Sequence, residues 1–143
     1  MKPVPVNLVE QEPMRTGAQT RAPDPNVLPR APWGKAEALE RLDGDEDLLR
    51  ELCEIFLEES PKLLQKLGEA IAESDAAAVM RAAHSLKGEL GYLGAAAASQ
   101  ASASLEAMGI EKNLSDAVQV FAFLQEQMAA LRLAIKEFTG AMR

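Results

Sequence analysis

The single histidine of the chain, His84, is followed by a lysine and two glycines in a pattern that suits chemistry. Imidazole is a nucleophile near neutral pH, and histidine forms covalent intermediates in group transfer. Phosphoryl transfer depends on positioning and on charge compensation, and Lys87, one helical turn after His84, can supply a positive charge. The pattern therefore indicates a phosphoryl-accepting histidine. The competing interpretation is a surface or capping histidine, the commoner role of a lone histidine on a helix.

Gly88 and Gly91 interrupt the helical pattern around this histidine. Each costs about 1 kcal/mol relative to alanine in a helix interior, so their presence needs a reason. With about 100° of rotation per residue, both lie within about 40° of His84 on the outward side of the helix. This position weakens the alternative of close packing between helices, and the missing side chains would let the backbone of another protein approach. Arg81 and Tyr92 project from the Gly88 side, where they could rim a docking surface or be solvated surface residues.

Periodic apolar residues predict that most of the chain is helical. Ala and Leu dominate the apolar residues, and strand-forming runs of Val, Ile, Thr and Tyr are missing. We expect helices over residues 35–42, 46–74, 75–94 and 95–108, and a last helix from residue 115 to the residue before Gly140. Four long amphipathic helices with short loops predict an all-α fold, an antiparallel four-helix bundle with a short extra N-terminal helix.

The same periodicity predicts which residues face the core. For the third helix these are Val79, Ala83, Leu86, Leu90 and Leu93. For the fourth helix they are Ala98, Ala101, Leu105 and Met108. For the last helix they are Val118, Phe121, Leu124, Met128, Leu131, Ile135 and Phe138. The second helix has a gap in its apolar stripe between Phe56 and Leu63, and Pro61 in that gap should bend the helix.

Residues typical of helix ends set the expected boundaries. The segment 43–45, Asp-Gly-Asp, should end the first helix and cap the second. Gly109 should close the fourth helix as a left-handed C-cap. Ser115 and Asp116 should act as a capping pair at the start of the last helix.

The first 33 residues differ in composition from the rest of the chain. They contain seven of the eight prolines and show no sustained apolar period, which is typical of a disordered or extended tail or a linker. We therefore expect a tail over residues 1–33 and a folded domain over residues 34–143.

Charge and composition exclude several classes of protein. A net charge of −7 argues against a nucleic-acid-binding surface, which needs a basic stripe. No run of about 18 apolar residues is present, so we expect no membrane span, and the first residues lack the pattern of a signal peptide. The lone Cys53 cannot form an internal disulfide and is interpreted as a small core residue. We expect a cytoplasmic protein and a monomer.

Glu106 is a further candidate because of its register. If the chain reverses near Ala95, His84 and Glu106 are each eleven residues from the turn and lie level on neighbouring helices. A carboxylate there could accept a hydrogen bond from Nδ1–H and leave Nε2 free to attack. A solvated glutamate on a helix face is the alternative interpretation.

The motif from His84 to Gly94 resembles that of the histidine-containing phosphotransfer (HPt) domains, H-x-[LI]-K-G-x-x-[GA]-x-[LFV]-G. The resemblance extends from about residue 35 to 138 and includes the segments ALERLDGDEDLLREL and FLEESPKLL. It implies that His84 is the phosphorylated residue, that Lys87 is the phosphate-side cation, and that Gly88 and Gly91 form the docking floor for a response-regulator receiver domain. The resemblance further implies a role for Glu106, because in related phosphotransfer domains of chemotaxis kinases a glutamate at the matching position orients the histidine ring.

The resemblance also implies partners and a place in signalling. Expected partners are a response-regulator receiver domain and a sensor histidine kinase, and the receiver is expected to supply the aspartate and Mg²⁺. The chain should need no cofactor of its own and should not be an enzyme, because it has no nucleotide-binding loop. Glu89 and Leu90 stand where the family usually has small residues, and this departure bears on partner choice.

Two other functions compete with the phosphocarrier. One is a helical interaction module that docks receivers without phosphorylation. The intact His84 and Lys87 argue against this function. The other is a structural or metal-binding bundle. Metal sites in bundles gather several inward His and Glu ligands, and one outward histidine cannot do that. We therefore predict no metal site.

Overall fold

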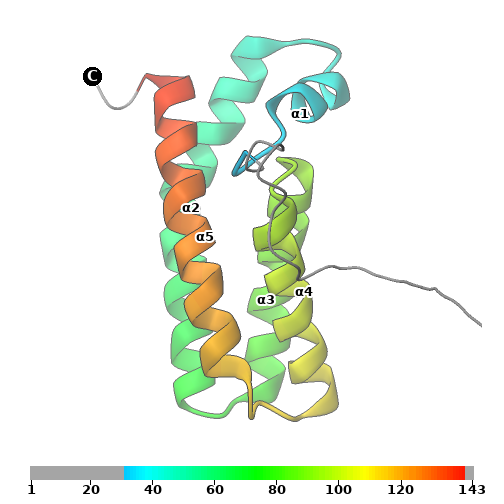
Figure 1. The fold of residues 1–143 in the computed structure, drawn as a ribbon, viewed down its shortest axis with the longest axis vertical. Coiled ribbons are helices and arrows are strands. Elements are labelled where there is room, and N and C mark those ends of the chain that lie inside the picture. Colours follow the sequence, from blue (N-terminus) through cyan, green and yellow to red (C-terminus); the bar gives the residue numbers. More distant parts are fainter. Residues whose placement is uncertain (1–30, 141–143) are drawn as a thin grey trace, which may run out of the picture. The chain divides into compact units, whose positions relative to one another are not determined.

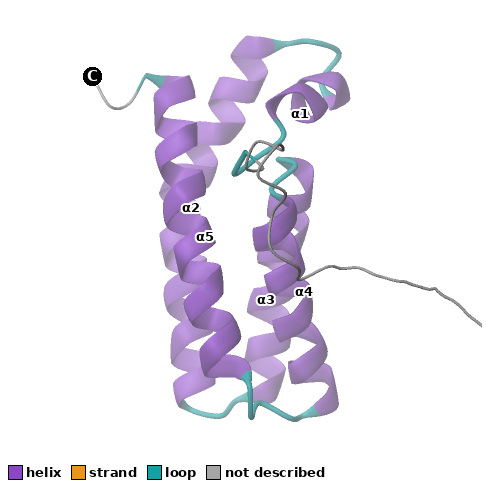
Figure 2. Ribbon diagram, viewed as in Figure 1, coloured by secondary structure: helices purple, strands orange, loops and turns teal. Residues whose placement is uncertain are grey.

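The computed structural model describes residues 31–140, and these residues form helices joined by short turns (Figure 2). The elements are α1 (Lys35–Arg41), α2 (Glu46–Ala72), α3 (Ala76–Tyr92), α4 (Ala96–Glu111) and α5 (Ala117–Thr139). The four long helices run alternately up and down as a bundle, with the short α1 at one end (Figure 1). The predicted all-α fold with a short extra helix is confirmed. None of the described helices is long and apolar enough to cross a membrane.

The core of the bundle contains the apolar stripe predicted for α3. All five residues of that stripe are buried, which fixes the rotation of α3 and turns its opposite face outward. In α5 the residues predicted to face the core are buried from Leu124 to Ile135. Val118 was also predicted to face the core, but it is 67% exposed, so that prediction was wrong. Ala117 is buried instead, because a seven-residue step to Leu124 keeps a residue on the same face and a six-residue step turns it away by about 120°.

Aspartates cap the N-termini of α2 and α3. Asp45 accepts a hydrogen bond from Leu48 N at 3.0 Å, and Asp75 accepts one from Ala78 N at 3.1 Å. Each satisfies a backbone donor that the first turn of a helix leaves without a partner. The predicted break and cap before α2 are thus confirmed.

The polar gap in the stripe of α2 has a specific partner on α5. Proline has no N–H, so Pro61 leaves the carbonyl of Leu57, four residues earlier, without its helical donor. The guanidinium of Arg132 donates to Leu57 O at 2.8 Å and to Oγ of the buried Ser60 at 2.9 Å. The helix continues through the proline because a side chain from a neighbouring helix replaces the lost donor.

We expect Arg132→Met to destabilise the domain by about 2 kcal/mol, since it removes a charged donor from two acceptors. In a Pro61→Ala background, the restored N–H can bond to Leu57 O, so the same substitution should cost less. Urea unfolding of the four proteins in this double-mutant cycle measures the difference. Equal costs in both backgrounds would show that Arg132 does not compensate for the proline.

Two predicted helix ends were wrong. Gly109 does not close α4, because the helix continues to Glu111 and Lys112 takes the left-handed position with φ 59°. Gly109 is instead buried against α3, where an added Cβ would lie 2.7 Å from Ala76 O and from Met80 N.

The predicted capping pair before α5 was also wrong. Asp116 occupies the N-cap position, but its side chain makes no capping hydrogen bond. Ser115 instead donates from N and Oγ to Asn113 Oδ1, at 3.2 and 2.9 Å. The loop therefore satisfies these groups before the helix begins.

The segment before α1 packs on the bundle. The predicted tail included Trp33, but its ring is buried and lies 5.6 Å from the ring of Phe138, so the folded domain includes it. Gly34 N donates to Leu93 O at 3.0 Å, which attaches this segment to the turn between α3 and α4. The rest of the predicted tail, up to residue 30, lies outside the described residues.

Cys53 is fully buried in the core, as predicted for a small apolar filler. Burial, and then the charge of Glu54, raise the pKa of the Cys53 thiol to about 11. The thiol therefore stays protonated and weakly nucleophilic at neutral pH.

Candidate functional site

The site lies on the face that α3 turns away from the core. The side chain of His84 is 66% exposed, while its neighbours Ala83 and Leu86 are buried. Gly94, with φ 71°, and Ala95 form the tight turn after which α4 runs back beside α3 (Figure 1). This reversal brings Glu106 of α4 level with His84.

The structure places Glu106 Oε2 2.7 Å from His84 Nδ1. An ionised carboxylate can only accept a hydrogen bond, so Nδ1 carries the proton in this pair. In the neutral ring, Nε2 then has a free lone pair, and the exposed ring presents it to solvent. The geometry is that of a nucleophile whose tautomer is set by a neighbouring carboxylate.

Lys87 makes a contact that the sequence analysis missed. Its Nζ lies 2.6 Å from Glu106 Oε1, so the carboxylate bridges the lysine and the histidine. The Lys87 hydrogen bond, and after it the His84 hydrogen bond, hold the pKa of Glu106 below its usual range. Glu106 therefore remains ionised into mildly acidic conditions. The side chain of Lys87 is 38% exposed.

The two glycines lie on the surface beside the histidine. Apart from the adjacent backbone of α3, a Cβ at Gly88 would have no heavy atom within 4 Å, and one at Gly91 would meet only Ser99 Oγ, at 3.7 Å. Ser99 Oγ also donates to Lys87 O at 3.3 Å, a contact from α4 that local sequence patterns do not reveal. The backbone next to His84 is thus bare enough for another molecule to approach it.

A family model settles the relationship of this chain to known proteins. The model of the Hpt domain matches residues 51–134, which is more than half of the sequence. The chain belongs to the Hpt domain family. Hpt domains are phosphotransfer carriers of phosphorelays and have no kinase domain.

The fold of this Hpt domain is also found in a solved structure. Histidine-containing phosphotransfer protein B (HptB) from Pseudomonas aeruginosa PAO1 has a TM-score of 0.71 and 23% sequence identity to it, covering 78% of this chain and 97% of the other. At this identity the similarity establishes the fold. No curated protein matches the sequence.

The other predicted docking residues, Arg81 and Tyr92, make no hydrogen bond or ion pair with His84 within the described residues. Arg81 lines a groove between α2 and α3. Tyr92 is 39% exposed at the end of α3, and its carbonyl accepts a hydrogen bond from Arg41 at 2.6 Å. Glu89 lies toward α2, where burial and then the charge of Glu59 raise its pKa. At about 100° of rotation per residue, Glu89 lies about 140° around α3 from His84 and so does not stand between His84 and solvent.

We expect Glu106→Gln to slow phosphoryl transfer through His84 by about tenfold, because loss of an orienting partner typically costs a factor of this order. Glutamine can still occupy the position but does not restrict Nδ1 to the donor role. Nitrogen-15 NMR of the imidazole should show a mixture of neutral tautomers in the variant and mainly the Nδ1–H form in the parent protein. An unchanged tautomer ratio and rate would contradict an orienting role.

Proposed function

We propose that this Hpt domain carries a phosphoryl group on Nε2 of His84 in a His-Asp phosphorelay. The group would come from the aspartyl phosphate of a receiver domain, or from a sensor histidine kinase, and pass to the aspartate of a response-regulator receiver. The observation that carries the proposal is the exposed imidazole whose Nδ1 is bound to Glu106 at 2.7 Å.

The reaction follows from this arrangement. The Nε2 lone pair attacks phosphorus, the N–P bond forms, and the P–O bond to the donor aspartate breaks, with its electron pair leaving on the carboxylate. The Nδ1 proton stays in the hydrogen bond to Glu106, which stabilises the positive charge that develops on the ring. The reverse sequence transfers the group to the next aspartate. Mg²⁺ in the receiver compensates charge on the phosphoryl oxygens.

Lys87 has a second role in this proposal. In the unphosphorylated protein its ammonium pairs with Glu106, one helical turn from the reacting ring. A phosphoryl group on Nε2 offers stronger acceptors than a shared carboxylate, and a lysine can rotate toward them. Lys87 thus compensates charge on phosphohistidine while remaining close to its original partner.

A transfer experiment tests the proposed function. Purified receiver domains carrying labelled aspartyl phosphate are mixed with this protein, and labelled protein is then separated and exposed to acid or base. We expect label that is lost in acid and retained in base, as for phosphohistidine. If neither any phosphorylated receiver nor the small phosphodonor phosphoramidate labels the protein, the proposal is refuted.

A further inference from the structure

A groove of about 370 Å³ lies between α4 and α5. Its lining consists of Ala97, Gln100, Ala101 and Ser104 on α4 and Gln119, Val120 and Phe123 on α5. We call these seven residues the α4–α5 face. Phe123 is 46% exposed, although large apolar side chains are more often buried. The face therefore combines an open recess of small side chains with a bulky apolar side chain beside it.

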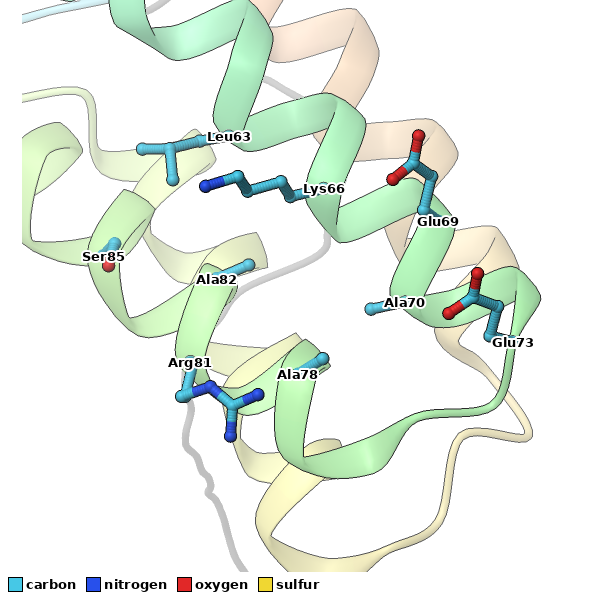
Figure 3. A pocket seen from close by; sticks show the side chains of 9 residues that line it. All are labelled: Leu63, Lys66, Glu69, Ala70, Glu73, Ala78, Arg81, Ala82 and Ser85. Carbon is cyan, nitrogen blue, oxygen red and sulfur yellow. The ribbon is translucent and has the colours of Figure 1, made fainter.

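The α4–α5 face carries no charge. Charged residues make up 26% of the chain, yet none of the seven residues of this face is charged. The groove between α2 and α3 shows the contrast, because charged side chains are among its lining residues: Lys66, Glu69, Glu73 and Arg81 (Figure 3). Depletion of charged residues together with an exposed aromatic residue is the composition of the centre of a protein interface.

The charge of the whole chain favours a second copy as the occupant of this face. Two copies, each with a net charge of −7, repel each other, and like charges placed opposite each other destabilise a complex. A two-fold symmetric contact places one surface against the same surface of the partner, so a face without charge avoids this repulsion. Glutamine and serine side chains carry both donors and acceptors, so Gln100, Ser104 and Gln119 can bond to the same residue types of a second copy.

The shape of the face also suits contact with itself. Ala97, Ala101 and Ser104 follow one another at steps of four and three residues, so they form a row of small side chains along α4. In a two-fold contact, a residue of one copy that meets a second residue of its partner is met in return by the same pair. Phe123 of each copy can therefore lie against the small side chains of the other, and the contact is complete with two copies.

We propose that the α4–α5 face joins two copies of this chain in a two-fold symmetric dimer. The proposal departs from the monomer expected from the sequence. It leaves the reacting groups uncovered, because Glu106 lies about 180° around α4 from Ala97, on the side where it binds His84 of α3. The dimer therefore exposes two phosphoryl-accepting histidines.

The contact should be weak. The α4 side of the groove extends from residue 97 to residue 104, which is about 10 Å of helix. Small interfaces of this kind are typical of transient complexes. We therefore expect half of the protein to be dimeric at a concentration of roughly 10–100 µM.

Sedimentation velocity of the full chain tests the proposal between about 5 and 500 µM, because self-association follows mass action. Ser104→Glu and Ser104→Lys each place the same charge on both copies of the exposed face. An equimolar mixture of these two variants places opposite charges there instead. Gln65→Glu is the matched control, since it adds a negative charge at an exposed position on α2, which packs against α3 and α5.

We expect the mass of the parent protein and of the control to rise from 15.4 kDa toward twice that value. Each Ser104 variant alone should associate at least about tenfold more weakly, and the mixture should recover dimers. Melting curves check that the variants fold, and phosphoramidate should label all of them at the parental rate.

Two results would overturn the inference. A parent protein that stays at 15.4 kDa throughout would leave the face to a different protein. A mixture of the two Ser104 variants that associates no better than either variant alone would place the contact on another surface. Neither result affects the phosphocarrier function, because labelling by phosphoramidate tests that function separately.

Discussion

Replacing His84 by glutamine should abolish phosphorylation of the protein completely. The chain has a single histidine, so the substitution removes the one imidazole that can form an acid-labile, base-stable phosphate. The ring is 66% exposed and contributes little to the core, so the helical circular dichroism spectrum and the melting temperature should stay close to those of the parent. Labelling by a phosphorylated receiver and by phosphoramidate, followed by melting curves, measures both effects.

A second variant controls for indirect effects of this substitution. Ser85→Ala changes the neighbouring exposed residue and leaves the contact between His84 and Glu106 in place. This protein should be labelled at close to the parental rate by phosphoramidate. Acid-labile, base-stable label in the His84→Gln protein would place the phosphoryl group elsewhere and contradict the assignment.

Replacing Gly109 by alanine should destabilise the domain by about 1–3 kcal/mol. The new Cβ would lie 2.7 Å from Ala76 O and Met80 N, which are backbone atoms of α3 and cannot move without moving the helix. This cost should exceed the gain of about 1 kcal/mol that alanine brings to a helix interior. Because α3 carries His84 and α4 carries Glu106, separating the two helices should also weaken the hydrogen bond between them.

Gly88→Ala is the matched control for the Gly109 substitution, since it makes the same chemical change on a helix of the same bundle. A Cβ at Gly88 has no neighbour within 4 Å, so this variant should be more stable than the parent by up to about 1 kcal/mol. Urea unfolding of the two variants should therefore give changes of opposite sign. A Gly109→Ala protein as stable as the Gly88→Ala protein would show that α3 and α4 are not closely packed there.

Local periodicity was sufficient to predict the face of α3. Between Val79 and Leu93 an apolar residue recurs every three or four residues, and every residue of that set is buried. A helix with one buried stripe must expose the opposite side, so the outward position of His84 followed from the sequence. Counting residues from the turn also predicted that Glu106 would lie level with His84, because two antiparallel helices rise equally per residue.

Features that depend on two helices at once could not be predicted from local sequence patterns. The same residue type, glycine, provides bare surface at Gly88 and close packing at Gly109, and only the position of the neighbouring helix separates the two uses. Ser60 interrupted the stripe of α2 without apparent cause, until Arg132, 72 residues later, was found to donate to it.

The sequence alone therefore predicted the helices, most of the residues on their buried faces, and the outward position of the single histidine. The tertiary structure alone decided that Lys87 pairs with Glu106 and that Gly109 lies against α3. The physical reason is that helix periodicity is set by hydrogen bonds four residues apart. The distance and rotation between helices are set instead by how side chains from distant parts of the chain interlock.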